Sequence, residues 1–251
     1  MDKIVIEQLS LQYTDGTESL RNVNLGIAEK AVTVLFGPAG GGKSTLLRCL
    51  NRLNDLTEVK VSAGRIMIDG ENVLDPKTDV IALRRKIGMV FARPVVLPMS
   101  IQQNVTYGLA LAGEKRRAHL AEAVERSLKL AALWDEVKGR LDEPAIALSG
   151  GQQQRLCLAR SLALQPEIIL LDEPTSGLDP ISTGKIEAAL QELKKKYTIV
   201  LVPHSVQQAA RTADYAAFFL QGELVERNVG KEMFTAPKDK RTEDYVMGRF
   251  G

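Results

Sequence analysis

Continuous apolar runs are the clearest pattern along the 251-residue chain. Short runs in which apolar residues do not alternate with polar ones are typical of strands buried on both faces, as in parallel sheets. The runs are "AVTVLF" (31–36), "EIILLD" (167–172), "YTIVLV" (197–202) and "AAFFL" (216–220). They predict the mainly parallel sheet of an α/β domain.

Two longer β-rich runs lie in the N-terminal third of the chain. "KIVIEQLSLQY" (3–13) and "GRIMIDGENV" (64–73) are bounded by glycine and acidic residues. Residues of these types form turns and commonly end strands. The two runs predict a small antiparallel sheet that flanks the main one.

Amphipathic segments between the apolar runs predict helices. "KSTLLRCLNRL" (43–53) follows the first run, and "TGKIEAALQELKKK" (183–196) spaces Ile186, Leu190 and Leu193 as one face of a helix. Strands that alternate with helices in this way predict a doubly wound core.

The strand pattern stops between Pro94 and Gly150. Within "AHLAEAVERSLKLAALW", residues Leu120, Val124 and Leu128 fall on one helical face. We therefore expect a single domain over 1–251, with a core formed by 1–93 and 151–251 and a helical subdomain inserted at about 94–150.

Composition and charge narrow the functional classes. The 33 basic and 31 acidic residues are interspersed and leave a net charge of +2, so we expect no nucleic-acid partner. The N-terminus "MDKIVIEQLS" lacks the features of a secretory signal, which predicts a cytoplasmic chain. Cys49 and Cys157 lie in apolar contexts and are expected to be buried thiols.

The segment "GPAGGGKST" follows a predicted strand and precedes a predicted helix. It fits the pattern G-x-x-x-x-G-K-[ST], in which backbone N–H groups and a helix N-terminus surround phosphate oxygens. Lys43 is expected to neutralise the terminal phosphates, and Ser44 to bind Mg²⁺. The expected nucleotide contacts are Gly37, Pro38, Ala39, Gly40, Gly41, Gly42, Lys43, Ser44 and Thr45.

Two adjacent acidic residues, Asp172 and Glu173, lie at the C-terminal end of the apolar run at 167–172, at the edge where parallel sheets bind ligands. We expect Asp172 to act on Mg²⁺ and Glu173 to orient or activate the attacking water. The alternative is that the pair caps the next helix.

A histidine follows the next strand, in "YTIVLVPHS". From that strand end His204 would reach a γ-phosphate beside the phosphate loop and the two acids, which favours a catalytic role. A lone histidine at a strand end is otherwise commonly structural.

A second glycine-rich segment, "LSGGQQQR" (148–155), lies between the phosphate loop and "LLDEP". Together with "SGLD" and His204, it makes nearly the whole chain resemble ATP-binding cassette ATPases. The resemblance implies that two copies pair head to tail around two ATP molecules. Ser149, Gly150, Gly151 and Gln152 would then contact the nucleotide held by the partner copy.

The same resemblance implies roles for two further residues. Asp179, in "SGLDP", is similar to the residue that links the two sites across the dimer. Tyr13 lies where the family has an aromatic residue that stacks on adenine. A half-buried strand tyrosine is the alternative for Tyr13.

More specific segments resemble the cassette of bacterial phosphate importers. They include "LLRCLNRLNDL", "PMSIQQNVTYG", "LWDEVKGRL" and "PKDKRTEDYVMGRFG". That resemblance implies an ATPase on the cytoplasmic face of the inner membrane, with ATP and Mg²⁺ as cofactors. It also implies two membrane subunits as partners and, through them, a solute-binding protein.

The chain departs from the family pattern at two positions. Ala92 stands after "GMVF", where the family has a glutamine that links the nucleotide to the membrane subunits. A methyl group makes no hydrogen bond, so we expect hydrolysis to survive and coupling to change. Pro203 replaces the usual threonine before His204, and an extended strand end tolerates proline.

Three alternatives stay open at this point. One is a cassette for another solute, either phosphonate or an amino acid. Another is a regulatory cassette with little turnover, which Ala92 favours. A third is a soluble cassette that remodels nucleic acid or ribosomes, although such proteins usually carry two cassettes or a long coiled-coil insertion.

Overall fold

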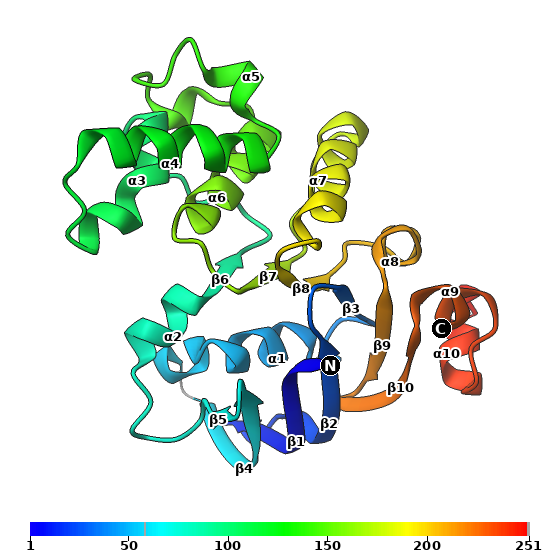
Figure 1. The fold of residues 1–251 in the computed structure, drawn as a ribbon. Helices are drawn as coiled ribbons and strands as arrows, with labels where there is room; N and C mark the ends of the chain where they lie inside the picture. Colours follow the sequence, from blue (N-terminus) through cyan, green and yellow to red (C-terminus); the bar gives the residue numbers. More distant parts are fainter. Residues whose placement is uncertain (58, 250–251) are drawn as a thin grey trace.

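Two β-sheets lie on opposite sides of helix α1 (Lys43–Leu50) in the computed structural model, which describes residues 1–57 and 59–249 (Figure 1). The larger sheet has the strand order β10-β9-β3-β8-β7-β6, and all of its pairs are parallel except that of β9 and β10. The predicted α/β fold with a mainly parallel sheet is therefore confirmed. Its strands are β3 (Val32–Phe36), β6 (Ile87–Val90), β7 (Ile168–Asp172), β8 (Thr198–Val202), β9 (Tyr215–Leu220) and β10 (Glu223–Val229).

The central strands divide their side chains between two hydrophobic cores. In β3, Val34 and Phe36 face a core shared with the overlying helices, whereas Leu35 faces the core between the two sheets. In β8, Leu201 faces the core shared with the overlying helices and Val202 faces the core between the two sheets. Because both faces are covered, nearly every position of these strands is apolar, the exceptions being the buried Thr33 of β3 and Thr198 of β8, and no alternation appears in the sequence.

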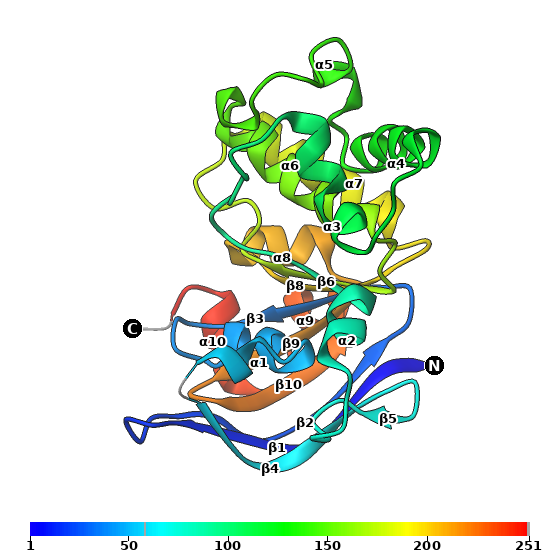
Figure 2. The same ribbon diagram turned by 90° about the vertical axis from the view of Figure 1, so that its left-hand side faces the viewer.

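The smaller sheet is antiparallel, as predicted, with the order β2-β1-β4-β5. It forms the base of the molecule below α1 in Figure 2. The sequence did not reveal β2, because Asn22 adopts a φ of 46° beside a register shift and breaks the alternation of buried residues. The strands are β1 (Asp2–Tyr13), β2 (Glu18–Ala28), β4 (Val59–Ile68) and β5 (Glu71–Asn72).

Helices form a separate lobe above the larger sheet (Figure 1). On α4, Val124 and Leu128 of the predicted apolar face are buried. Helix α6 begins where the proposed helical subdomain ends, and it packs on both α3 and α4. The helices of this lobe are α3 (Ile101–Leu111), α4 (Arg117–Leu130), α5 (Trp134–Val137), the 3₁₀ turn η2 (Ala145–Ala147) and α6 (Gly150–Ala163).

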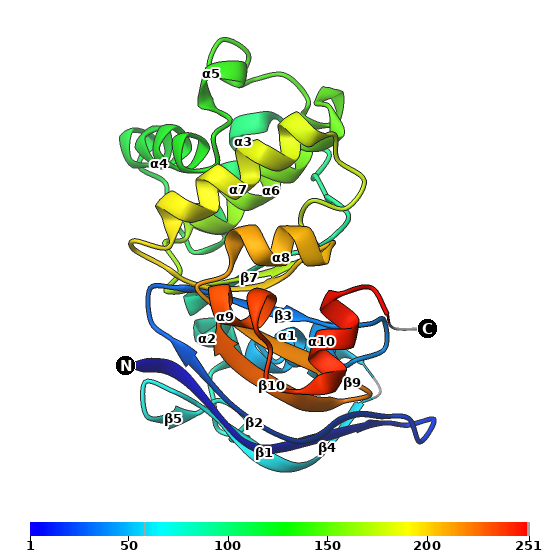
Figure 3. The same ribbon diagram turned by 90° about the vertical axis from the view of Figure 1, so that its right-hand side faces the viewer.

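The remaining helices surround the larger sheet. Figure 3 shows α7 rising beside α6, with α8 at its base and α9 and α10 flanking β10. The predicted helix over 43–53 ends earlier, at Leu50, because Arg52 is left-handed with a φ of 57°. These helices are η1 (Leu53–Leu56), α2 (Val80–Lys86), α7 (Pro180–Leu193), α8 (Val206–Thr212), α9 (Gly230–Thr235) and α10 (Lys240–Val246).

Aromatic packing attaches the C-terminal helices to the larger sheet. The ring of Phe36 lies 5.0 Å from that of Phe234 on α9, and the ring of Phe218 lies 5.1 Å from that of Tyr245 on α10, measured between centroids. Contacts of this kind add to the free energy gained by burying the rings. No helix within residues 1–57 and 59–249 combines the length and the apolar character that crossing a membrane requires.

Both cysteines are free and buried, as expected from their apolar surroundings. Burial raises the pKa of the Cys49 thiol to about 12, and it also raises that of Cys157. Neither side chain therefore presents a reactive thiolate.

Candidate nucleotide site

The loop between β3 and α1 can form only with glycine at its two ends. Gly37 has a φ of 136°, and a Cβ there would lie 2.0 Å from the carbonyl oxygen of Phe219. Gly42 has a φ of 92°, and its Cβ would lie 2.3 Å from the carbonyl oxygen of Ser19. Neither conformation nor approach is open to a residue with a side chain. The expected phosphate loop is therefore built by close backbone contacts.

Lys43 is the first residue of α1, and its ammonium folds back over this loop. Its Nζ donates hydrogen bonds to the carbonyl oxygens of Gly37, at 2.9 Å, and Pro38, at 2.7 Å. Burial lowers the pKa of Lys43, while the negative charges of Glu173 and Asp172 oppose that shift. A cation is thus held at a helix N-terminus, which itself attracts anions.

The end of β7 meets the phosphate loop through one hydrogen bond. Ser44 Oγ donates to Asp172 Oδ1 over 2.8 Å, and Asp172 is almost fully buried. The contact joins residues 128 positions apart. Serine and carboxylate oxygens placed together in this way suit a hard divalent cation.

Glu173 follows Asp172 in an unusual backbone conformation. Its φ is 47°, and its N–H donates to the carbonyl oxygen of Val202 over 2.9 Å. A positive φ at a residue other than glycine is costly and is typical of functional sites. Neither acid caps α7, since the N-cap of that helix is Asp179. The capping alternative for Asp172 and Glu173 is therefore wrong.

His204 lies beyond the end of β8 and is exposed. Its backbone N–H donates to Oε1 of Gln208 over 2.9 Å, and Thr175 Oγ1 donates to the same oxygen over 3.0 Å. Gln208 is only 2% exposed. One buried amide thus joins the segment after Glu173 to the backbone of His204.

The sequence pattern does not indicate that Gln208 connects Thr175 and His204. The available signal was a polar residue one helical turn after His204, in the first turn of a short helix. Its burial depends on the packing of α8 against β3 and α7, which a single sequence does not reveal.

Tyr13 lies beside the phosphate loop at the end of β1. Its hydroxyl hydrogen-bonds Thr45 Oγ1 over 2.8 Å, and Ser19 Oγ donates to the same atom over 2.8 Å. The ring is half-buried against the core between the two sheets. Stacking of Tyr13 on adenine stays a prediction.

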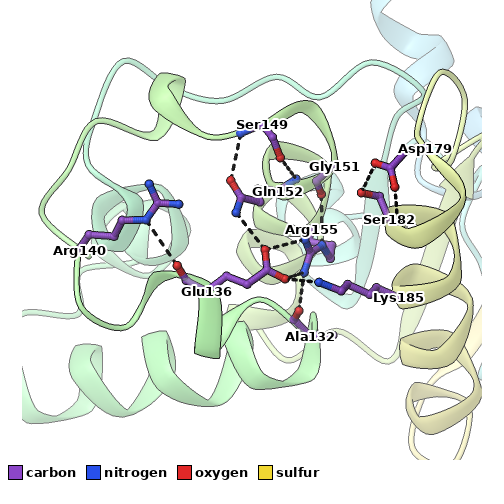
Figure 4. A network of polar contacts seen from close by, with 10 residues as sticks. All are labelled: Ala132, Glu136, Arg140, Ser149, Gly151, Gln152, Arg155, Asp179, Ser182 and Lys185. Carbon is purple, nitrogen blue, oxygen red and sulfur yellow. Dashed lines mark hydrogen bonds and ion pairs between the residues drawn. The ribbon is translucent and has the colours of Figure 1, made fainter.

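The second glycine-rich segment forms the first turn of α6, and we call residues 149–152 the signature turn (Figure 4). Ser149 is the N-cap: its N–H donates to Gln152 Oε1 over 3.0 Å, and its Oγ accepts from the N–H of Gln152 over 3.4 Å. Gly150 is exposed and Gly151 is buried. The turn belongs to the helical lobe rather than to the phosphate loop, and a helix N-terminus of this kind attracts anions.

The signature turn packs directly on the first turn of α7. A Cβ on Gly151 would lie 2.4 Å from Ser182 Oγ. Ser182 donates its backbone N–H and its hydroxyl to the two carboxylate oxygens of Asp179, over 2.9 and 2.6 Å. These hydrogen bonds hold the pKa of Asp179 below its usual range.

The segment after β6 is attached to the same helix. Gln154 Nε2 on α6 donates to the carbonyl oxygen of Phe91 over 2.8 Å. Ala92 follows and is partly exposed, and Arg93 is exposed. The position where the family pattern has glutamine therefore lies between the larger sheet and α6.

Comparison with known proteins places the chain in a family. Residues 20–176 match the ABC transporter family, over more than half of the chain. The chain belongs to the ABC transporter family. The phosphate import ATP-binding protein PstB of Shewanella denitrificans is 55% identical over 98% of this chain and 90% of its own length.

Solved structures of ABC transporter proteins have the same fold. The cbiO1 protein of Clostridium perfringens, described as part of the ABC transporter complex cbiONQ, aligns with a TM-score of 0.83 and 29% identity over 99% of this chain and 96% of its own. The ATP-binding cassette MJ0796, described as a dimer in a post-hydrolysis state bound to ADP and Pi, aligns with a TM-score of 0.79 and 30% identity over 91% of this chain and 99% of its own. This chain is thus an ABC-type ATPase.

Proposed function

We propose that this chain is the ATP-hydrolysing subunit that drives the import of inorganic phosphate. The contact of Ser44 with Asp172, beside Lys43 and Glu173, carries the ATPase part of the proposal. The 55% identity with a phosphate import ATP-binding protein supports phosphate as the solute.

In the proposed reaction, water attacks the γ-phosphate of ATP, the bond between the γ-phosphorus and the β–γ bridging oxygen breaks, and ADP and inorganic phosphate are released. The backbone N–H groups of Gly37 and of residues 39–45 bind the phosphates, while Pro38 has no N–H to donate. Lys43 neutralises the terminal phosphates. Glu173 orients the water and accepts its proton, while His204 contacts the γ-phosphate. Positioning and electrostatic stabilisation account for most of the catalysis of phosphoryl transfer, and the rigid backbone contacts of Glu173 and His204 suit that task.

Mg²⁺ is part of the proposal, and the residues present fit it. Within residues 1–57 and 59–249, no group of three or more His, Cys, Asp and Glu could hold a metal ion. Mg²⁺ in nucleotide sites typically uses one or two protein oxygens together with phosphates and water. Ser44 and Asp172 would provide those protein oxygens. When bound, the ion neutralises charge on the β- and γ-phosphates.

The signature turn requires a second copy of the chain in this proposal. Ser149, Gly150, Gly151 and Gln152 of one copy would contact the ATP held by the phosphate loop of the other. Asp179 would link the two sites, and Tyr13 would stack on adenine. Cyclic pairing of two identical chains is the commonest symmetry for such an arrangement.

The proposed partners beyond the second copy are two membrane subunits and, indirectly, a solute-binding protein. They would place the chain peripherally on the cytoplasmic face of the cell membrane. The inserted segment predicted at about 94–150 would receive the membrane subunit at its junction with the core.

Ala92 favours a second candidate, a regulatory cassette with low turnover. In that case the chain would bind ATP with the same residues but hydrolyse it slowly within the transport complex. A cassette for phosphonate or an amino acid is the other candidate, because the transported solute does not enter this chain in either reading.

The deciding experiment is ATP hydrolysis by the chain assembled with its membrane subunits and solute-binding protein in vesicles, with and without phosphate. We expect hydrolysis that phosphate stimulates. A Glu173→Gln complex is the control, and it should lose at least about a hundredfold in kcat. Stimulation by phosphonate or an amino acid alone would replace phosphate as the solute, and absence of turnover in the unmodified complex would favour the regulatory role.

A further inference from the structure

The carboxylate of Glu136, on the short helix α5, joins this helix to two others, α6 and α7 (Figure 4). Its Oε1 accepts from Arg155 of α6 over 2.7 Å and from Lys185 of α7 over 2.6 Å. Its Oε2 accepts from Arg155 over 3.0 Å and from Gln152 of the signature turn over 2.9 Å. The hydrogen bond from Arg155 is the main reason that the pKa of Glu136 falls to about 2. The carboxylate is therefore ionised at neutral pH.

The bond to Gln152 fixes both ends of one amide. Gln152 Oε1 accepts from the N–H of Ser149, and Gln152 Nε2 donates to Glu136. Rotation of this amide would break both hydrogen bonds at once. The orientation of the Ser149 backbone thus depends on the position of Glu136.

The bond to Lys185 connects the same carboxylate to α7. That helix begins at the Asp179 cap, and its Ser182 lies against Gly151. We call residues 179–182, at the start of α7, the Asp179 turn. The signature turn is therefore held to α7 at two points: Gly151 packs on Ser182 of the Asp179 turn, and Glu136 joins Gln152 to Lys185 by charge-assisted hydrogen bonds. Charge-assisted hydrogen bonds of this kind are stronger than neutral ones.

We propose that Glu136 is a positioning residue that fixes the signature turn relative to the Asp179 turn, so that both present one rigid surface to the partner's ATP. The proposal rests on the function proposed above. Glu136 would not touch nucleotide itself. Its effect should appear only at the step in which two copies enclose ATP.

The burial of the partners guides the choice of variants. The Arg155 side chain is only 3% exposed, and it also donates to the carbonyl oxygens of Ala132 and Gly151. Glu136→Gln keeps the size of the side chain and an oxygen for Arg155, whereas an alanine would leave this buried cation poorly paired. Lys185 is 43% exposed, so Lys185→Met removes the link to α7 without burying an unpaired charge.

The test measures two quantities for Glu136→Gln. One is the affinity of the separate full chain for ATP, and the other is kcat/KM for ATP hydrolysis by the complex in vesicles. We expect ATP affinity of the separate chain to stay within about twofold, because the phosphate loop is unchanged, and kcat/KM of the complex to fall about tenfold. Asp135→Asn is the matched control. It removes a neighbouring carboxylate of α5 whose partner is Lys138 and whose side chain is 86% exposed.

The inference would be overturned if Glu136→Gln had the same kcat/KM as Asp135→Asn. It would also be overturned if Glu136→Gln lowered the ATP affinity of the separate chain as much as it lowered kcat/KM. If Glu136→Gln does not fold, Lys185→Met decides. A selective fall in kcat/KM of about threefold supports the proposal, and unchanged kinetics overturn it. Absence of hydrolysis in the unmodified complex would instead contradict the proposed function, together with this inference.

Discussion

At the scale of single residues, the position of Ala92 has the clearest functional consequence. The neighbouring carbonyl of Phe91 is bound to Gln154 of α6, so the backbone here is attached to the helix that carries the signature turn. The Ala92 methyl group adds no polar contact of its own. Signals between nucleotide and membrane subunits would then pass through the backbone at this position rather than through a side chain.

Replacing Ala92 with glutamine tests that consequence. We expect Ala92→Gln to raise phosphate-stimulated hydrolysis relative to basal hydrolysis, by up to about tenfold for one hydrogen bond near a charged group. The measurement is the ratio of the two rates in vesicles, together with phosphate uptake. Ala121→Gln, at an exposed position on α4, is the control. If Ala92→Gln changes neither the rate ratio nor the uptake, the hypothesis of altered coupling is wrong.

Residues that form local motifs could be predicted from the sequence, whereas residues that connect distant segments could not. Gly37 and Lys43 belong to one contiguous pattern, and Asp172 follows an obvious strand. Glu136 lies in the segment "LWDEVKGRL", but nothing in that segment indicates what its carboxylate contacts, and Gln208 lies on a short helix with no pattern around it. Their roles arise from contacts between elements, such as the 49 positions that separate Glu136 from Lys185.

The same distinction holds at the scale of secondary-structure elements. Strands buried on both faces were predictable because nearly every position is apolar. Strand β2 was hidden by a bulge at Asn22, and β10 by its position at the sheet edge, where the residues alternate less clearly between buried and exposed. Helix α7 begins at Pro180, three residues before the predicted start, because Asp179 provides the N-cap and proline is favoured in the first turn.

Gln208 connects several of these elements, and its replacement should affect catalysis more than binding. Gln208→Leu removes the oxygen that accepts from His204 and Thr175. Leaving the buried hydroxyl of Thr175 unpaired costs about 1–3 kcal/mol of folding free energy. We expect kcat to fall at least about tenfold with little change in KM, measured with the melting temperature of each variant.

A charge exchange provides the control for this prediction. Gln208 Nε2 donates to Glu187 of α7 over 3.3 Å. Gln208→Glu keeps the accepting oxygen but places a second negative charge beside Glu187, so we expect this single variant to lose activity. Adding Glu187→Gln removes the repulsion and should restore activity. An active Gln208→Leu variant would show that His204 needs no support from α8.

At the scale of the whole molecule, the two helix N-termini that we propose to bind ATP lie on different lobes. The phosphate loop belongs to the core beside α1, and the signature turn begins α6 in the helical lobe (Figure 1). The proposed head-to-tail pair brings one of each together at every ATP. Each site would then contain residues from two chains.

Mixing two inactive variants tests this arrangement. Lys43→Ala disables the phosphate loop, and Ser149→Phe blocks the signature turn; we expect each complex to be inactive alone. When the two chains are mixed equally with the membrane subunits, half of the pairs combine both variants and contain one intact site. Hydrolysis should return to about a quarter of the unmodified rate. No recovery would contradict independent sites shared between chains.

The buried cysteines have a practical consequence for measuring the distance between the two lobes by site-directed labelling. Because neither Cys49 nor Cys157 offers an accessible thiolate, maleimide dyes and nitroxide spin labels should leave the native chain unmodified. One cysteine introduced on each lobe would then provide the two labelled positions, with no label on Cys49 or Cys157. Fluorescence transfer or electron-spin distances could be measured in a chain that keeps its own cysteines and its native packing.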